Sequence, residues 1–237
     1  DLIISANEER VDQLVNFYNL KKQRVITVKN IPGNSVHDLT ENFEKLKLTF
    51  PYLRDDKKYI VYQGVITPAR NLEKVLDTLV QLKDYDLLIV GDGPKIYFDN
   101  LKYRYTSNTN IHFVGRVALD QVYSFIKISH CGIISYSMQN LNNTYCAPNK
   151  LYEYAQFNLR MITTDQVLFK KTFEIFPFGM ILSPQVSANE LEVFLSKKLN
   201  DSIFDDFKRC NSNEIEMAKL LTEVLRLDNS NRSKNSE

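Results

Sequence analysis

The hydrophobic residues of the chain gather in short runs that are separated by longer stretches of helical spacing. An apolar run of about four to eight residues between turn-forming residues is typical of a strand buried on both faces. Eight runs of this kind predict strands over the following residues: Leu2–Ser5, Arg24–Val28, Tyr59–Gln63, Asp86–Val90, Ile111–Val114, Cys131–Ser135, Arg160–Thr163 and Gly179–Leu182.

Between these runs, apolar residues recur three and four positions apart, which places them on one face of a helix. Two segments show this spacing, the first with Leu72, Val75, Leu76, Leu79 and Leu82 and the second with Leu119, Val122, Tyr123 and Ile126. Strands that alternate with helices are typical of an α/β protein. We therefore predict a Rossmann-like open parallel sheet with helices on both faces.

A cluster of turn-forming residues at positions 30–34 predicts a boundary between two parts of the chain. Residues 1–32 look like the closing βαβ unit of another domain, and residues 33–227 hold the main sheet. Residues 228–237 have almost no apolar content, which is typical of a disordered tail. Because the chain starts at Asp1, just before a predicted strand, we expect it to be a fragment whose upstream part is missing.

Composition and charge narrow the classes of protein. The chain has 237 residues, of which 43% are hydrophobic and 25% charged, as in an ordinary soluble globular protein. Its 30 basic and 29 acidic residues give a net charge of +1, which argues against a nucleic-acid-binding protein. Three tyrosines at 97, 103 and 105 alternate with basic residues, and at this charge an amphipathic helix explains them better than a base-stacking surface. The three cysteines show no C-x-x-C spacing, so we expect no disulfide framework and a reducing, cytoplasmic location.

Glycine is scarce, with 7 in 237 residues. Four of these glycines, Gly64, Gly91, Gly93 and Gly115, directly follow predicted strands. In an open parallel sheet this carboxyl edge is where ligands bind, and glycine lets a ligand or a turning backbone come close. Any single turn could require glycine on its own, but four at one edge favour a binding edge. The Gly91–Gly93 segment lacks the third glycine of a dinucleotide fingerprint, which disfavours a dehydrogenase.

The segment from Ala147 to Tyr154 is the strongest local signal. Pro148 suits the first turn of a helix, and a helix N-terminus at the ligand edge offers backbone N–H groups to an anion. Lys150 adds a cation at the same place. Glu153 lies one turn further on, where it can cap the helix or accept hydrogen bonds from a ligand's hydroxyl groups; chemistry alone favours capping.

Other polar residues carry weaker signals. The histidines His37, His112 and His130 are scattered, and a lone histidine rarely performs chemistry without partners. The pair Asp55-Asp56 only superficially resembles a metal-binding D-x-D motif, and we expect it to be solvated surface. The loop 139–144 either contributes to a ligand pocket or is simply exposed, and the strand-end residues Tyr136 and Ser137 are weaker candidates of the same kind.

Several blocks, taken in order, resemble a known family. They are Tyr62-Gln63-Gly64, Arg70, Leu87–Pro94, Asn110–Gly115, Pro148–Tyr154 and Met161–Asp165. This ordered set is similar to the nucleotide-sugar-dependent glycosyltransferases of the two-domain GT-B fold, in particular glycosyltransferase family 4, also called group 1. The resemblance implies that the chain is the C-terminal, donor-binding domain, preceded in residues 1–32 by a remnant of the acceptor-binding domain.

The resemblance also implies roles for individual residues. Arg70, Lys150 and Glu153 would be the catalytic residues, with the two cations on the donor's diphosphate and the carboxylate on the ribose hydroxyls. The implied donor-binding residues are Gly64, Gly91, Gly93, Gly115, Arg116, Val117, Tyr145, Pro148, Asn149 and Leu151. Among them, Gly64 begins the loop under the diphosphate, and Gly115 with the two residues after it lies beside the base.

Two positions depart from the family pattern. The family's E-x7-E motif has its first glutamate eight positions before Glu153, where this chain has Tyr145. That carboxylate normally touches the transferred sugar, so the departure leaves the identity of the sugar and the extent of activity open. Many relatives have an arginine after the first glycine, where this chain has Val65.

The functional expectation is the donor-binding domain of a retaining, metal-independent hexosyltransferase that builds a surface polysaccharide or related glycan. The donor would be a UDP- or GDP-sugar, with no cofactor and no nucleic acid. The acceptor, a glycan or a lipid-linked molecule, would bind through the missing domain, and peripheral membrane association of the full-length protein stays open. We expect the chain alone to bind donor but to transfer little sugar. The alternative is a non-catalytic nucleotide-sugar- or protein-binding partner module of the same fold.

Overall fold

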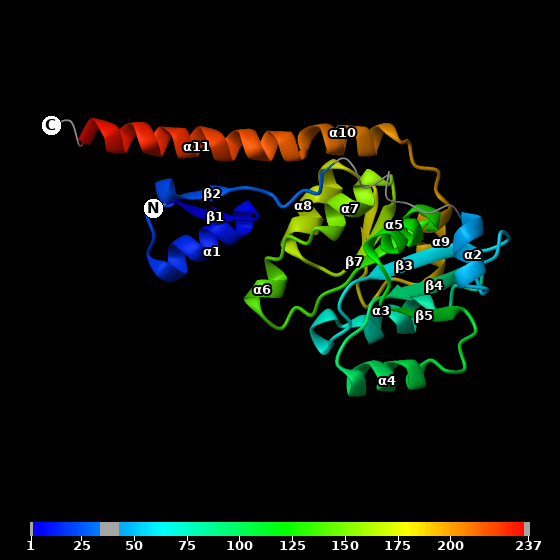
Figure 1. Ribbon diagram of the computed structural model, residues 1–237. Coiled ribbons are helices and arrows are strands. Elements are labelled where there is room, and N and C mark those ends of the chain that lie inside the picture. The colour runs from blue at the N-terminus through cyan, green and yellow to red at the C-terminus, as the bar shows by residue number, and fades with distance from the viewer. Residues whose placement is uncertain (1, 34–42, 235–237) are drawn as a thin grey trace.

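The computed structural model describes residues 2–33 and 43–234, in which two parallel sheets lie side by side (Figure 1). His37 and Asn34 lie outside the described residues. The larger sheet has six strands in the order β5-β4-β3-β6-β7-β8, and every pair is parallel. Its strands are β3 (Lys58–Gln63), β4 (Tyr85–Val90), β5 (Ile111–Gly115), β6 (Cys131–Ile134), β7 (Arg160–Thr163) and β8 (Gly179–Ile181). This architecture confirms the predicted open parallel sheet.

The smaller sheet consists of β1 (Ile3–Ser5) and β2 (Val25–Thr27). Helix α1 (Glu8–Tyr18) and a short 3-10 turn connect the two strands, so this part is a single βαβ unit. It matches the unit expected for residues 1–32, and the predicted boundary at residues 30–34 falls between the two sheets. The division into domains at that boundary stays a prediction.

All eight predicted strands are present, and no strand end differs from the prediction by more than one residue. The differences have local causes. Arg24 ends the 3-10 turn instead of starting a strand. Ser135 leaves the strand pairing of β6, and its hydroxyl donates a hydrogen bond of 2.5 Å to the carbonyl of Arg70.

Helices cover both faces of the larger sheet. One face packs against α2 (Phe43–Thr49), α5 (Leu119–Ile128), α7 (Lys150–Gln156), α8 (Val167–Ile175) and α10 (Ser202–Cys210). The other face packs against α3 (Leu72–Leu79), α4 (Lys95–Arg104) and α9 (Ala188–Ser196). The short helix α6 (Leu141–Thr144) precedes α7.

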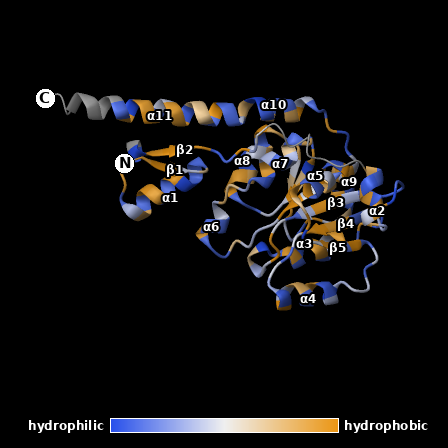
Figure 2. Ribbon diagram, in the orientation of Figure 1, coloured by the Kyte–Doolittle hydropathy of each residue, from blue (hydrophilic) through white to orange (hydrophobic). Residues whose placement is uncertain are grey.

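The central strands explain why the apolar runs are continuous. Within β3, Tyr59 and Val61 belong to the core on one face, whereas Ile60 and Tyr62 belong to the core on the other. Successive side chains of a strand point to opposite faces, so a strand covered on both sides must be apolar throughout. Figure 2 shows these strands as the hydrophobic centre of the domain.

The predicted helix faces are buried, with one exception. The apolar residues of α3 are at most 2% exposed, whereas Leu119 at the start of α5 is 60% exposed. The expected amphipathic character of α4 is weak, because Leu101 is its one buried residue and Tyr103 is 84% exposed. The hydroxyl of Tyr97 donates to Glu73 at 2.6 Å, and that of Tyr105 donates to Asp77 at 2.7 Å, so both side chains fasten α4 to α3.

The C-terminal segment differs from the prediction. Helix α11 (Asn213–Lys234) continues through most of the segment expected to be disordered, and only residues 235–237 lie outside the described chain. Extending an existing helix is far easier than starting one, so polar residues can continue a helix that apolar contacts begin upstream. The buried Glu216 anchors that upstream part, because its carboxylate accepts from the backbone N–H of Lys29 at 2.9 Å. Within residues 2–33 and 43–234, no helix combines the length and apolar content that crossing a membrane requires.

Candidate functional site

The turns after β3, β4 and β5 are fastened to one another at the carboxyl edge of the larger sheet. The N–H of Gly64 donates to Val90 at 2.9 Å, and the N–H of Gly91 donates to Gly115 at 2.7 Å. Gly91 has a φ of +128°, and a Cβ on it would lie 2.0 Å from the carbonyl oxygen of Gly64. A Cβ on Gly93 would lie 1.7 Å from the carbonyl oxygen of Ile66.

The four predicted edge glycines therefore fall into two groups. At Gly91 and Gly93 the close neighbour is backbone of an adjacent turn, so these glycines hold the edge together. At Gly64 the close neighbour is the ammonium of Lys150, whose Nζ would lie 3.0 Å from an added Cβ. At Gly115 nothing lies within 4 Å of that position. Of these four glycines, Gly64 and Gly115 are therefore the two whose backbone a ligand could approach. Gly64 faces the Lys150 ammonium, and Gly115 faces open space among the described residues.

Two cations meet above the ring of Tyr136. Arg70 ends a 3-10 turn, and its Cζ lies 4.3 Å from the centroid of that ring. Lys150 is the first residue of α7, and its Nζ lies 5.8 Å from the same centroid and 5.6 Å from that of Tyr62. Neither cation forms an ion pair with another residue of the described chain.

Burial and the neighbouring charge of Arg70 lower the pKa of Lys150 to about 8, and Glu153 opposes part of this shift. The pKa of Glu153 is raised, chiefly by burial, while Lys150 and a hydrogen bond from Gln63 lower it. Two close cations with one partly buried carboxylate leave an excess of positive charge. Such a site stabilises an anion, and an anion would in turn favour the charged form of the lysine.

Glu153 does not cap α7, so the role that chemistry alone favours is wrong. The helix has no side-chain cap hydrogen bond, and the carboxylate instead accepts from Nε2 of Gln63 at 2.5 Å. Gln63 is the last residue of β3, next to Gly64. The contact brings Glu153 to the carboxyl edge of the sheet, beside the two cations.

The other predicted site residues of this segment lie just before α7 or at its start. Helix α7 begins two residues after Pro148, with Asn149 as its N-cap residue. The buried Leu151 can offer only its backbone to a ligand, and its N–H donates to the carbonyl of Pro148 at 3.2 Å. Tyr145 ends α6, and its carbonyl accepts from the Asn7 side chain at 3.1 Å.

The two residues after Gly115 lie at the same edge but two strands away from β3. Arg116 is exposed, and Val117 packs partly against the core. The structure thus brings Gly64, Arg70, Lys150 and Glu153 together and leaves this second group separate, as expected for a ligand that extends along the sheet edge.

The sequence alone did not predict Arg10 as a site residue. Arg10 lies on α1, the helix of the smaller βαβ unit. Its Nη2 donates to the side-chain oxygen of Asn142 at 2.8 Å and to the carbonyl of the same residue at 3.2 Å. Arg10 and Arg70 line a common hollow of about 470 Å³. Nothing in the local sequence around Arg10 marks it, because the contact joins two segments that are 132 residues apart.

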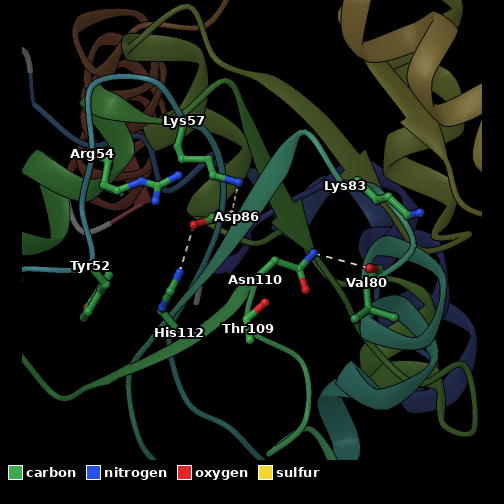
Figure 3. A pocket seen from close by; sticks show the side chains of 9 residues that line it. All are labelled: Tyr52, Arg54, Lys57, Val80, Lys83, Asp86, Thr109, Asn110 and His112. Atoms are coloured by element: carbon green, nitrogen blue, oxygen red, sulfur yellow. Dashed lines mark hydrogen bonds and ion pairs between the residues drawn. The ribbon is translucent and has the colours of Figure 1, made fainter.

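A second hollow, of about 490 Å³, lies at the opposite, amino edge of β3, β4 and β5 (Figure 3). Its central group is the carboxylate of Asp86, which is 3.0 Å from Nε2 of His112 and 3.4 Å from Nζ of Lys57. His112 also stacks on the ring of Tyr52, with centroids 4.4 Å apart. These partners give His112 a structural role, as its position within a strand suggests.

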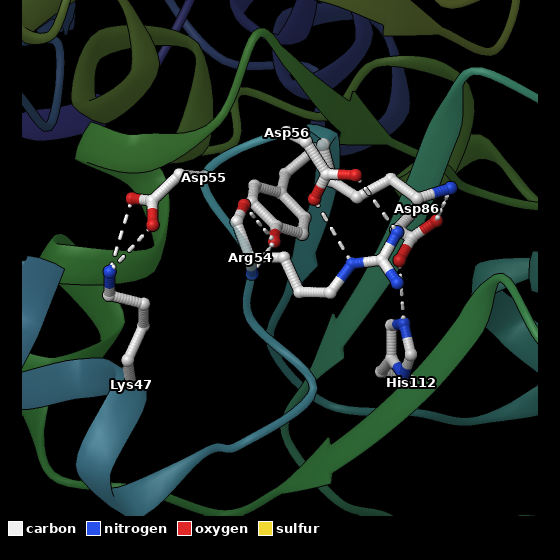
Figure 4. Close-up of polar contacts among 8 residues, drawn as sticks. Lys47, Arg54, Asp55, Asp56, Asp86 and His112 are labelled. Carbon is white, nitrogen blue, oxygen red and sulfur yellow. Dashed lines mark hydrogen bonds and ion pairs between the residues drawn. The ribbon is translucent and has the colours of Figure 1, made fainter.

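Two neighbouring carboxylates are solvated, which confirms their interpretation as surface (Figure 4). Asp55 pairs with Lys47 at 2.9 Å and Asp56 with Arg54 at 3.1 Å, and both carboxylates are more than 70% exposed. His130 also has a structural contact, because its Nδ1 accepts from the backbone N–H of Tyr59 at 3.3 Å.

Replacing Asp86 by asparagine is expected to lower the free energy of unfolding by about 1–3 kcal/mol, because a partly buried Lys57 loses its counter-charge. Urea denaturation of the 237-residue chain measures this. The matched control is Asp56→Asn, where the carboxylate is 71% exposed and a change of less than about 0.5 kcal/mol is expected. Equal stabilities of the two variants would contradict the structural role of Asp86.

Comparisons with known proteins agree with this geometry. A family model described as "Glycosyl transferases group 1" matches residues 44–216. A glycosyltransferase from Rickettsia africae superposes with a TM-score of 0.73 at 14% identity, over 94% of this chain and 62% of that one. Anabaena HepE in complex with UDP and glucose has a TM-score of 0.67 at 12% identity, over 95% of this chain and 62% of that one. Sucrose-phosphate synthase from Thermosynechococcus elongatus has a TM-score of 0.69 at 14% identity, over 96% of this chain and 59% of that one.

No curated protein matches the sequence. The chain spans only about three fifths of the length of the three structures, so it corresponds to part of each of them. The six-stranded parallel sheet with helices on both faces is that of a GT-B glycosyltransferase, and it fits the C-terminal domain of that fold. Because the matched family segment covers well over half of its residues, the chain belongs to the glycosyl transferases of group 1.

Proposed function

We propose that this chain is the donor-binding part of a nucleotide-sugar-dependent glycosyltransferase. The observation that carries the proposal is the pair of cations, Arg70 and Lys150, which meet over Tyr136 beside the single carboxylate of Glu153 and form no ion pair among the described residues, with Lys150 next to Gly64. A nucleotide diphosphate placed at this turn would supply the missing negative charge. The bound UDP of the Anabaena structure, which has the same fold, supports a nucleotide at this edge.

The chemistry of the site follows from that placement. When the bond between the sugar and the diphosphate breaks, negative charge grows on the leaving oxygen. Cations that are already in place stabilise this charge without having to reorganise, which lowers the barrier to transfer. Backbone N–H groups at Asn149 and Lys150, at the start of α7, would add further stabilisation to the phosphates.

The remaining parts of the donor lie on either side of the diphosphate in this proposal. Glu153 accepts hydrogen bonds from the ribose hydroxyls, and Gln63 holds its carboxylate in place. The base lies beside Gly115, Arg116 and Val117, where open backbone faces the ligand edge. The residues proposed to contact the donor come from the end of β3 and from the segments that follow β3, β5 and β6.

The proposal extends to the reaction and its setting. The two side-chain cations supply charge stabilisation at the diphosphate, which supports a metal-independent reaction, and the resemblance to family 4 supports retention of configuration. We propose a UDP- or GDP-sugar as donor and a glycan or lipid-linked acceptor that binds outside this chain. A surface polysaccharide is the proposed product, supported by the similar fold of WaaG, a glycosyltransferase involved in lipopolysaccharide biosynthesis. The proposed location is cytoplasmic, with the full-length protein at the membrane surface.

Titration calorimetry with UDP, GDP and ADP tests the proposal, and binding of UDP or GDP is expected. Replacing Glu153 by alanine is expected to weaken that binding by about 1–3 kcal/mol, because a carboxylate facing the ribose would be lost. Glu223→Ala, on exposed helix α11, is the matched control and should leave the affinity unchanged. An unchanged affinity of the Glu153 variant would limit Glu153 to a structural role beside Gln63. Lack of binding of all three nucleotides would contradict the proposed function.

A second candidate function is a non-catalytic nucleotide-sugar-binding partner module. Tyr145 favours it, because this position lacks the carboxylate that the family pattern has there. The two functions differ in turnover by the full-length protein, since a binding module would hold donor without hydrolysing or transferring it. The 237-residue chain itself is expected to bind donor and to transfer little sugar, and robust transfer by this chain would contradict that expectation.

A further inference from the structure

The hollow that Arg10 and Arg70 share lies directly beside the proposed diphosphate position, and the inference drawn from it rests on the proposed function. Besides the two arginines, its walls include Tyr136, Asn142 and Asn143. None of the described residues that line it is acidic. We name it the Arg10 hollow. Because Arg70 belongs both to this hollow and to the cation pair, a group attached to the diphosphate would enter it.

The guanidinium of Arg10 is held in place without being neutralised. Asn7 caps α1 by accepting from the backbone N–H of Arg10 at 3.0 Å. The amide nitrogen of Asn7 donates to the carbonyls of Tyr145 at 3.1 Å and Cys146 at 3.3 Å, which fixes α1 against the loop before α7. Among the described residues, the guanidinium of Arg10 donates hydrogen bonds only to the neutral Asn142, through Nη2.

The rest of the Arg10 guanidinium is available to a ligand. An arginine has five N–H donors, and within the described residues its Nε and Nη1 have no hydrogen-bond partner. Arg10 also forms no ion pair with any residue of the described chain. A fixed guanidinium with free N–H groups is suited to a carboxylate, which it binds through two parallel hydrogen bonds.

The Arg10 hollow holds two cations, Arg10 and Arg70, and no carboxylate among its described lining residues, so it suits an anionic group. Each phosphate of the diphosphate carries one charge, and Arg70 and Lys150 supply one cation each. Arg10 is a further cation, in the hollow that it shares with Arg70. Neutral sugar hydroxyls are commonly bound by carboxylates, yet the polar groups that line the hollow include two guanidinium and two amide groups. Tyr145 stands in the chain where the family pattern has a glutamate.

We propose that the donor sugar bears a carboxylate, as in a nucleotide-linked uronic acid, and that Arg10 binds this carboxylate. Arg70 and Lys150 hold the diphosphate at the same time. Residues 1–32 then contribute a specificity-determining side chain to the donor site, in addition to their place in the preceding domain. The other anion that Arg10 could bind is a phosphate of the acceptor. In that case, a carboxylate on the donor sugar would not change the affinity for the donor.

Calorimetry at pH 7 and low salt tests the proposal with two pairs of donors, UDP-glucuronic acid against UDP-glucose and GDP-mannuronic acid against GDP-mannose. In the pair whose nucleotide binds, we expect the uronic acid to bind about tenfold more tightly. Arg10→Gln should reduce this ratio to about twofold or less while leaving the affinity for UDP or GDP alone unchanged. The control Arg24→Gln, at an exposed position of the same part of the chain, should keep the full ratio.

Two further variants separate charge from structure. Asn142→Ala removes an anchor of the guanidinium but not its charge, and the preference for the uronic acid should persist. Arg10→Lys should keep a reduced preference, because it retains the charge and loses the paired N–H geometry. If UDP or GDP binds but the uronic acid has no advantage, or if the advantage survives Arg10→Gln, this proposal is overturned and the proposed function stands. If neither nucleotide nor any of the four sugars binds, both are overturned.

Discussion

Replacing Lys150 by methionine is expected to weaken the binding of UDP or GDP at pH 7 by about 10- to 150-fold. A hydrogen bond between an ionised donor and an ionised acceptor contributes about 1.5–3 kcal/mol, and methionine retains the apolar stem while losing the charge. The Nζ of Lys150 lies next to the turn of Gly64, where the diphosphate is proposed to bind. Lys102→Met, on the exposed side of α4, is the matched control and should leave the affinity unchanged.

The same lysine gives the binding a characteristic pH dependence. Its pKa is lowered to about 8 in the free protein, and a bound diphosphate favours the charged form, so the pKa rises on binding. Well below pH 8 the lysine is charged in both states, and this group adds no pH dependence. Above pH 8 the free protein must take up a proton to bind, so affinity falls, by up to about tenfold per pH unit.

Calorimetry between pH 7 and pH 9.5 in buffers of different ionisation enthalpy measures both the affinity and the proton uptake. Lys150→Arg keeps its charge throughout this range, so its affinity should stay level while that of the natural sequence falls. A natural chain whose affinity does not change between pH 7.5 and 9.5 would contradict the assignment of Lys150 to the diphosphate.

Gly91→Ala is expected to lower the free energy of unfolding by more than about 3 kcal/mol. Two costs add at this residue. Its φ of +128° is one that L-residues rarely adopt, and a Cβ would lie 2.0 Å from the carbonyl oxygen of Gly64. Backbone cannot move aside as a flexible side chain can, so the turns after β3 and β4 would have to separate.

Thermal and urea denaturation of three variants test this expectation. Gly33→Ala, with no atom within 4 Å and no positive φ, should change stability by less than about 0.5 kcal/mol. Gly115→Ala has a φ of +81° but open space, so a cost of about 1–2 kcal/mol is expected. For a chain of this size, Gly91→Ala should lower Tm by more than about 6 °C. A Gly91 variant as stable as the Gly33 variant would contradict the packing of the turns.

The fold could be predicted from the sequence because its strands are covered on both faces. Burial of β3 by two separate cores requires apolar residues at successive positions, and such runs stand out in the sequence. The ends of the strands could not be predicted as well, because they depend on side-chain contacts such as that of Ser135 with Arg70. The continuation of α11 to Lys234 depends on helix propagation and was likewise hidden from an argument based on apolar content.

The candidate site was predictable only where its residues lie close together in sequence or in recognisable blocks. Lys150 and Glu153 share one segment, and Arg70 follows the glycine turn of β3. The partner of Glu153 is 90 residues away, and the anchor of Arg10 is 132 residues away. Pairings at such separations are set by how the sheet and the smaller βαβ unit come together, which no local pattern encodes.

The linked turns at the carboxyl edge divide the donor site into a fixed wall and an adjustable one. The turns of Gly64, Gly91 and Gly115 are joined through their backbones, so a change of sequence there alters the sheet itself. The opposite wall, formed by the loop before α7, is contacted by the side chains of Asn7 and Arg10 from the smaller βαβ unit. Variants selected by directed evolution for a different donor should therefore carry substitutions in residues 139–146 and in α1. The glycine turns should stay unchanged.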